Sequence, residues 1–158
     1  MPCNDINNPS FESAFDFWYP GATPDYTTAW IGSGDGNAYS GNEFVTLATT
    51  PSHPQGTLNQ DLYWLDDEVS YELTVQFRIV EPFGPIEGCT VSALLDDNEF
   101  ASQFVSEVGD WQALTGVIQP PERNMTLSLK AVCGFSEESQ DYQGQVLFDD
   151  VLFGPHCD

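Results

Sequence analysis

The most constraining feature of this sequence is a strict alternation of apolar and polar side chains over residues 70–80. The odd positions from 71 to 79 are Tyr, Leu, Val, Phe and Ile, and the even positions from 70 to 78 are Ser, Glu, Thr, Gln and Arg. Successive side chains of a β-strand point to opposite faces of its sheet, so this period of two predicts a half-buried strand. Residues 89–95 and 125–133 repeat the pattern, which places Cys89 and Cys133 on the inward faces of two further strands.

Seven other short segments also have strand-like composition between turn-forming residues. No ten-residue window shows a helical stripe, and Pro120-Pro121 removes the backbone donors that a continuing strand would need. Nine or ten short strands without helices indicate an all-β fold, an antiparallel β-sandwich of jelly-roll type, in a single domain over residues 3–157. The seven additional strands are predicted at residues 6–12, 27–31, 44–48, 58–65, 100–105, 111–118 and 146–153.

The charge balance excludes two classes of partner. The chain has 25 acidic residues against 3 basic ones, a net charge of -22, so phosphate backbones and anionic membrane surfaces would repel it. No apolar run approaches the roughly 20 residues of a membrane span. We therefore expect neither a nucleic-acid partner nor membrane insertion. Because 41% of the residues are hydrophobic, the acidic chain is still expected to fold.

Four cysteines point to an oxidising compartment. They lack the C-x-x-C spacing of a zinc site, and two of them lie next to the chain ends. Since domain termini are commonly close together, Cys3 with Cys157 and Cys89 with Cys133 form the most economical of the three possible pairings. We expect a secreted or extracellular protein. The single N-glycosylation sequon, Asn124-Met125-Thr126, agrees with that expectation.

Four motifs in order along the chain resemble galactose-binding-like jelly-roll domains. They are residues 8–12 (NPSFE), 38–41 (AYSG), 111–114 (WQAL) and 148–153 (FDDVLF). The resemblance covers nearly the whole chain and is closest to carbohydrate-binding modules of families four, nine and twenty-two and related domains of secreted fungal proteins. It implies a non-catalytic, secreted module that binds a polysaccharide or oligosaccharide, such as one from a plant or fungal cell wall.

The same resemblance implies a structural calcium ion. Its ligands would be Glu12, one or both of Asp149 and Asp150, and oxygens of the loop that contains Ser40 and Asn42. Calcium takes six to eight oxygen ligands, which a first strand, a last strand and a loop could supply together if the termini are adjacent. The alternative is that Asp149-Asp150 is an ordinary strand-end pair and that Glu12 is solvated.

Sugar recognition combines aromatic faces with polar side chains, and three regions of the sequence offer both. Trp18 and Tyr19 lie in a predicted loop, and Tyr63-Trp64 would place one ring on each face of a strand, whereas Trp30 and Trp111 are expected in the core. Gln103 lies between Phe100 and Phe104. A further candidate surface is an outward sheet face that carries the polar residues Gln76, Arg78, Ser92, Ser128 and Lys130. The alternatives are packing of the aromatic residues and cations that merely relieve acidic repulsion.

Catalysis has no comparable support in the sequence. The chain contains no Gly-x-Ser-x-Gly elbow and no phosphate-binding loop in a strand-to-helix context, and acid pairs arise by chance among 25 acidic residues. We therefore expect a glycan-binding module, attached to other domains of a larger secreted protein. A cell-surface adhesion or structural domain that binds protein partners on the same scaffold is the alternative.

Overall fold

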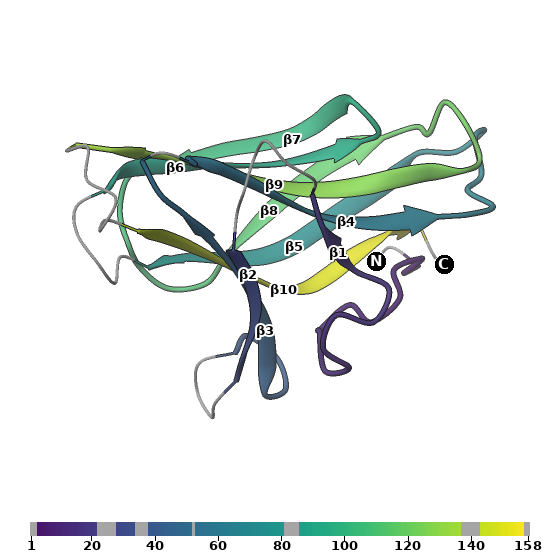
Figure 1. Cartoon of the computed structure of the whole chain (residues 1–158). Helices are drawn as coiled ribbons and strands as arrows, with labels where there is room; N and C mark the ends of the chain where they lie inside the picture. Colours follow the sequence, from purple (N-terminus) through teal and green to yellow (C-terminus); the bar gives the residue numbers. More distant parts are fainter. Residues whose placement is uncertain are drawn as a thin grey trace.

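The computed structural model describes residues 3–21, 28–33, 38–51, 53–80, 86–136 and 143–156, and these form two antiparallel five-stranded sheets (Figure 1). One sheet has the order β1-β4-β9-β6-β7 and the other β2-β3-β10-β5-β8. The strands are β1 (Tyr19–Pro20), β2 (Thr28–Ser33), β3 (Glu43–Thr49), β4 (Gln55–Leu62), β5 (Tyr71–Val80), β6 (Ile86–Leu95), β7 (Asn98–Val105), β8 (Gln112–Ile118), β9 (Met125–Phe135) and β10 (Gly144–Pro155). The described residues contain no helix that could span a membrane.

The core lies between the two sheets, and the alternation in β5 decides which of its side chains enter it. Every odd position of β5 is buried and every even position is half-buried, as the sequence predicts. The inward positions of β6 and β9 pack in the same core, among them Val91, Ala93, Leu127 and Leu129. The predicted antiparallel β-sandwich is confirmed.

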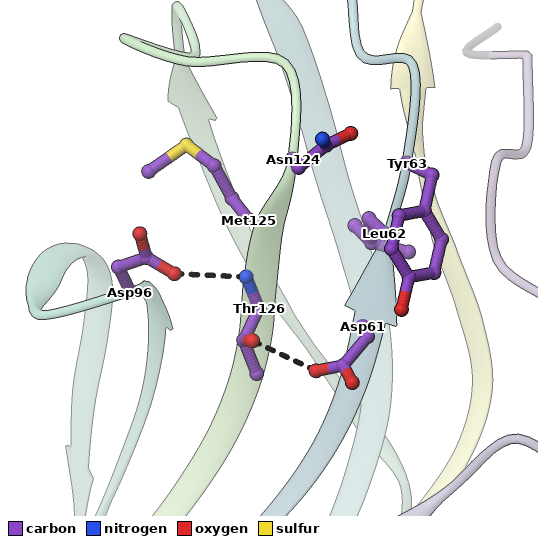
Figure 2. A pocket seen from close by; sticks show the side chains of 7 residues that line it. All are labelled: Asp61, Leu62, Tyr63, Asp96, Asn124, Met125 and Thr126. Atoms are coloured by element: carbon purple, nitrogen blue, oxygen red, sulfur yellow. Dashed lines mark hydrogen bonds between the residues drawn. The ribbon is translucent and has the colours of Figure 1, made fainter.

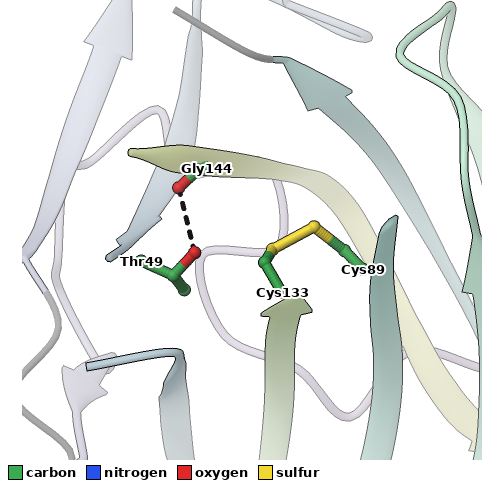
Figure 3. The surroundings of a disulfide bond; sticks show 4 residues. All are labelled: Thr49, Cys89, Cys133 and Gly144. Atoms are coloured by element: carbon green, nitrogen blue, oxygen red, sulfur yellow. Dashed lines mark hydrogen bonds between the residues drawn. A yellow bond between two sulfur atoms is a disulfide. The ribbon is translucent and has the colours of Figure 1, made fainter. Parts of the chain in front are cut away.

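Cys89 and Cys133 are direct partners across the β6–β9 pair and form a disulfide, with their Cα atoms 4.0 Å apart. Figure 3 shows the bond at the ends of two neighbouring strands, near the hydrogen bond from the Thr49 hydroxyl to the Gly144 carbonyl. The predicted pairing of these two cysteines is confirmed. Cys157 lies outside the described residues, so a bond between Cys3 and Cys157 remains a prediction.

The predicted strand over residues 6–12 is wrong. The start of the chain pairs with β10, where Cys3 N–H donates to Pro155 and Asp5 N–H donates to Phe153, and farther along Val151 N–H donates to the Pro9 carbonyl. Tight turns follow, because Asn8 and Phe11 adopt positive φ angles of 51° and 58°, which an extended strand does not allow. Gly154 permits the close approach of this segment, since a Cβ there would collide with the carbonyl of Cys3.

Two other boundaries differ from the expectation. The strand predicted at residues 58–65 is β4, which begins at Gln55 and ends at Leu62, so Tyr63 and Trp64 lie beyond the sheet. β10 runs from Gly144 to Pro155, and its register shifts between Asp149 and Leu152. Asp150 has a positive φ of 50° at that irregularity. Local composition finds these strands, but cross-strand pairing sets their ends.

Candidate functional site

The outer surface of the β1-β4-β9-β6-β7 sheet carries polar side chains between two exposed aromatic residues. Tyr19 on edge strand β1 is 43% exposed, and Phe104 on edge strand β7 is 65% exposed. Cross-strand partners share one face of a sheet, so the register places the residues between them on this outer surface. We call the set the polar face: Tyr19, Thr57, Asn59, Asp61, Ser92, Ser102, Phe104, Ser128 and Lys130.

Hydrogen bonds order one half of the polar face. The Tyr19 hydroxyl donates to Asp61 Oδ1 at 2.6 Å, and the Thr126 hydroxyl donates to the same oxygen at 2.8 Å. The bond to the carboxylate raises the pKa of Tyr19 and lowers the pKa of Asp61. The Tyr19 ring is thus held at the sheet edge in one orientation.

The centre of the polar face carries the ammonium of Lys130 and one amide, that of Asn59, which is 8% exposed. Lys130 lies between Thr57 and Ser92 in the register and makes no ion pair with any described residue. Next to it along β9, the Ser128 hydroxyl donates to Asn59 Oδ1 at 2.5 Å. Ammonium, amide and hydroxyl groups are the donors and acceptors that bind sugar hydroxyls.

A shallow pocket of about 160 Å³ opens at one end of the polar face. Figure 2 shows its lining from the end of β4, the start of β9 and the β6–β7 turn: Asp61, Leu62, Tyr63, Asp96, Asn124, Met125 and Thr126. Asp96 anchors this turn, because its carboxylate accepts Thr126 N–H at 2.9 Å while its own N–H donates to the Thr126 carbonyl. A second pocket, of about 360 Å³, continues past it and is lined by Trp64, Leu65, Asp66, Asp67, Glu68 and Arg123.

The interpretation of Trp18 as a sugar-stacking residue is wrong. Its side chain is 4% exposed, its ring packs on Phe11, and its Nε1–H donates to the Asn8 carbonyl at 3.0 Å. Both ring faces are therefore taken by the protein. Tyr19, the next residue, is the first residue of β1 and is exposed, as is Pro20 after it.

Trp64 is more exposed than expected, since 85% of it faces solvent. Tyr63 is 65% exposed as well, so the predicted placement of one ring on each face of a strand is wrong. The reason is that β4 ends at Leu62 and Trp64 turns the chain with a φ of 61°. Both rings protrude beyond the sheet.

Gln76 and Arg78 do not share a surface with Lys130. Both lie on β5, in the other sheet, and the Arg78 Nε–H donates to the Gly109 carbonyl at 2.7 Å. The predicted single face is wrong because β5 pairs with β8 and β10, whereas β6 and β9 pair with each other. Gln103 is also absent from the polar face, since it pairs with inward-facing Val91 and its amide donates to Gln112 on β8.

The remaining aromatic residues singled out in the sequence differ in how far they are buried. Phe100 packs on the core against Phe153, whereas Phe104 belongs to the polar face. Trp111 is half-buried, with edge contacts to Phe44 and Tyr39. The side chain of Trp30 lies outside the described residues.

Four of the five predicted calcium ligands converge on the loop before β3. The Glu12 carboxylate accepts N–H of Asn42 at 2.7 Å and of Glu43 at 2.6 Å, and Asp149 accepts Ser40 N–H at 2.9 Å. Gly41, with a φ of 63°, lets this loop close over Glu12. Asp150 donates its backbone N–H to Asp149 Oδ1 at 2.8 Å, and within the described residues its own carboxylate makes no hydrogen bond to this loop.

The chemistry of this cluster fits a hard cation. The Glu43 Oε2 atom is buried without a hydrogen-bond partner, and the backbone N–H of Glu43 donates to the Glu12 carboxylate, so carboxylate oxygens, the ligands that calcium prefers, are present at this loop. Asp149 is fully buried, and burial raises its pKa to about 6. Within the described residues, however, no three His, Cys, Asp or Glu side chains are grouped for a metal, so calcium stays a prediction.

The sequence reasoning missed the polar side chains of β4. Thr57, Asn59 and Asp61 alternate with inward Leu58, Gln60 and Leu62, which is the same signal that identified β5. The signal is weaker here because Gln60 is a polar residue at an inward position. Its buried amide is satisfied by two bonds to the Asn7 backbone.

Comparison with known proteins identifies the fold. No protein-family model and no curated protein matches the sequence. A carbohydrate-binding module of family 61 in complex with β-1,4-galactotriose superposes with a TM-score of 0.67 at 16% identity, over 98% of this chain and 99% of that chain. A second match is a Clostridium thermocellum xylanase, solved as its family 22 carbohydrate-binding module and glycoside hydrolase module with xylohexaose. It superposes with a TM-score of 0.66 at 17% identity, over 98% of this chain and 29% of that chain.

This chain has the β-sandwich fold of carbohydrate-binding modules. The carbohydrate-binding-module fold is not confined to binding proteins, because a cyclase from Fischerella sp. TAU also matches, with a TM-score of 0.63 at 18% identity over 98% of both chains. Function therefore has to be argued from the site rather than from the fold.

Proposed function

We propose that this protein is a non-catalytic, secreted glycan-binding module that holds an oligosaccharide across the polar face. The observation that carries the proposal is the pair of exposed aromatic residues, Tyr19 and Phe104, at the two edges of a sheet whose centre carries Lys130 and Asn59. Aromatic rings pack on the apolar faces of sugars, while a few polar groups fix the orientation of the ligand. An extended chain that crosses the strands would meet both rings.

The net charge narrows the ligand class. With a charge of -22, the surface disfavours polyanionic glycans, so we infer a neutral saccharide such as a cell-wall polysaccharide. The structures with the same fold contain β-1,4-galactotriose and xylohexaose, which makes neutral β-1,4-linked chains the first ligands to test. A structural calcium held by Glu12, Asp149 and the loop between them is part of the proposal.

Titration calorimetry with β-1,4-linked galacto-, xylo- and gluco-oligosaccharides tests it. We expect Phe104→Ala and Tyr19→Ala each to weaken binding about tenfold, equivalent to roughly 1.4 kcal/mol. Tyr19→Phe keeps the ring and should retain most of the affinity. Val117→Ala is the matched control, because Val117 is 61% exposed on β8 of the other sheet.

Two outcomes would contradict the proposal. Saccharide binding that survives both Phe104→Ala and Lys130→Ala would exclude the polar face as the site. No binding to any glycan, in calorimetry and on a glycan array with and without calcium, would favour the adhesion alternative instead.

A further inference from the structure

The sequon Asn124-Met125-Thr126 lies at an exposed edge of the sandwich. Asn124 is the last residue before β9 and is exposed, and it lines the pocket at the end of the polar face. In Figure 2 its side chain stands at the start of β9, across from Tyr63 at the end of β4. A large group attached here would extend into solvent without displacing the core.

The side chain of Asn124 is hydrogen-bonded through its oxygen and not through its nitrogen within the described residues. Its Oδ1 accepts the backbone N–H of Trp64 at 3.3 Å. No described residue accepts a hydrogen bond from its Nδ2, the atom to which an N-linked sugar is attached. The amide is thus held through its oxygen while its nitrogen faces outward.

Two residues with exposed rings lie near Asn124 in the fold. Tyr63 lines the same pocket as Asn124, and Trp64 is joined to Asn124 by the hydrogen bond just described. Trp64 also has a φ of 61°, a conformation that bulky residues rarely adopt. Two large exposed rings, one of them on a residue with an unfavourable backbone conformation, indicate a partner that covers them.

We propose that Asn124 is N-glycosylated and that the first sugars of the glycan pack on Tyr63 and Trp64. In the reaction, Nδ2 attacks C1 of a lipid-pyrophosphate-linked oligosaccharide. The C1–N bond forms, the C1–O bond to the pyrophosphate breaks, and the amide loses a proton. The proposal rests on the secretion included in the proposed function, but not on glycan binding by the polar face.

The attached glycan would cover the two pockets that contain Tyr63, Trp64 and Arg123. It would leave Phe104 and Lys130 accessible, because these lie on β7 and near the middle of β9. The end of the sandwich would then carry the protein's own sugar, and the part of the polar face around Phe104 and Lys130 would stay open to a foreign one.

The test is expression of the full chain behind a secretion leader in a eukaryotic host, with intact-mass analysis of the chain in the secretory lumen. We expect a mass increase that peptide N-glycosidase removes, converting Asn124 to Asp. Asn124→Gln and Thr126→Ala should abolish the increase, and Thr126→Ser, which preserves the sequon, should retain it. An unmodified lumenal wild-type chain would overturn the proposal.

Thermal unfolding tests the contact with the two rings. Removing the glycan under native conditions should lower the melting temperature of the wild-type chain by about 2 °C or more, and this loss should vanish in the Tyr63→Ala/Trp64→Ala double variant. An equal loss in both chains would show that the glycan acts without touching the rings. Calorimetry on the deglycosylated chain reports on the polar face separately, so failure of either proposal is distinguishable from failure of the other.

Discussion

The ring of Trp18 packs against the ring of Phe11 with their centroids 5.2 Å apart, and this pair closes one part of the core. Phe11 is fully buried, and Trp18 also ties its indole N–H to the Asn8 carbonyl. The contact holds the irregular N-terminal segment on the sandwich, so Trp18 serves stability rather than ligand binding.

Replacement of Trp18 should therefore destabilise the fold. We expect Trp18→Ala to lower the free energy of unfolding by about 3–5 kcal/mol, since it removes a buried aromatic side chain. Urea denaturation measures the change, and Trp64→Ala is the matched control because Trp64 is 85% exposed. Equal effects of the two substitutions would contradict the assignment of Trp18 to the core.

The disulfide between Cys89 and Cys133 should be a main source of stability. It closes a loop with a sequence separation of 44, and the chain-entropy model assigns roughly 4 kcal/mol to a loop of this size. The Cys89→Ala/Cys133→Ala variant should lose about 2–4 kcal/mol and unfold with a larger m-value, because its denatured state is less constrained. An unchanged denaturation curve would contradict this prediction.

Glu12 should link stability to calcium. In chelator, Glu12→Ala should lose about 1–2 kcal/mol, because the N–H groups of Asn42 and Glu43 lose a charged acceptor. Calcium at about 100 times its Kd should add roughly 2.7 kcal/mol to the wild-type chain and far less to the variant. Glu107→Ala, at an exposed acid outside the cluster, controls for the change of charge. A wild-type melting temperature that is the same in calcium and in chelator would refute the calcium site.

Asp149 should give the metal-free protein a distinctive pH dependence. Its pKa rises from 3.8 to about 6 on folding, so between these values the folded state binds the proton more tightly than the unfolded state. Its contribution to stability is therefore greatest at low pH, falls as the pH rises through about 6, and is constant above. In chelator, Asp149→Asn should have a shallower decline in stability between pH 5 and 7 than the wild type. Parallel urea midpoints for the two proteins across that range would show that Asp149 does not titrate there.

The sequence by itself determined where β2 to β10 lie and which side chains of the strongest strands face inward, but it missed β1 and predicted a strand at residues 6–12 that does not form. The alternation in β5, and the matching phases of Cys89 and Cys133, follow from the two-residue period of an extended chain. That period is a local property, and it needs no knowledge of the neighbouring strand. The resemblance to carbohydrate-binding modules, rather than a local pattern, implied that Glu12 and one or both of Asp149 and Asp150 approach one loop, and Glu12 and Asp149 do so.

Only the tertiary structure decided which strands share a sheet. Arg78 and Lys130 have the same outward phase, yet they lie on different sheets because β5 pairs with β8 and β10 while β9 pairs with β4 and β6. Trp18 is expected in a loop and Trp64 in a strand, yet Trp18 is buried, whereas Trp64 is exposed beyond the end of β4. Sheet membership and burial depend on hydrogen bonds and contacts between residues far apart in the chain, which no local pattern encodes.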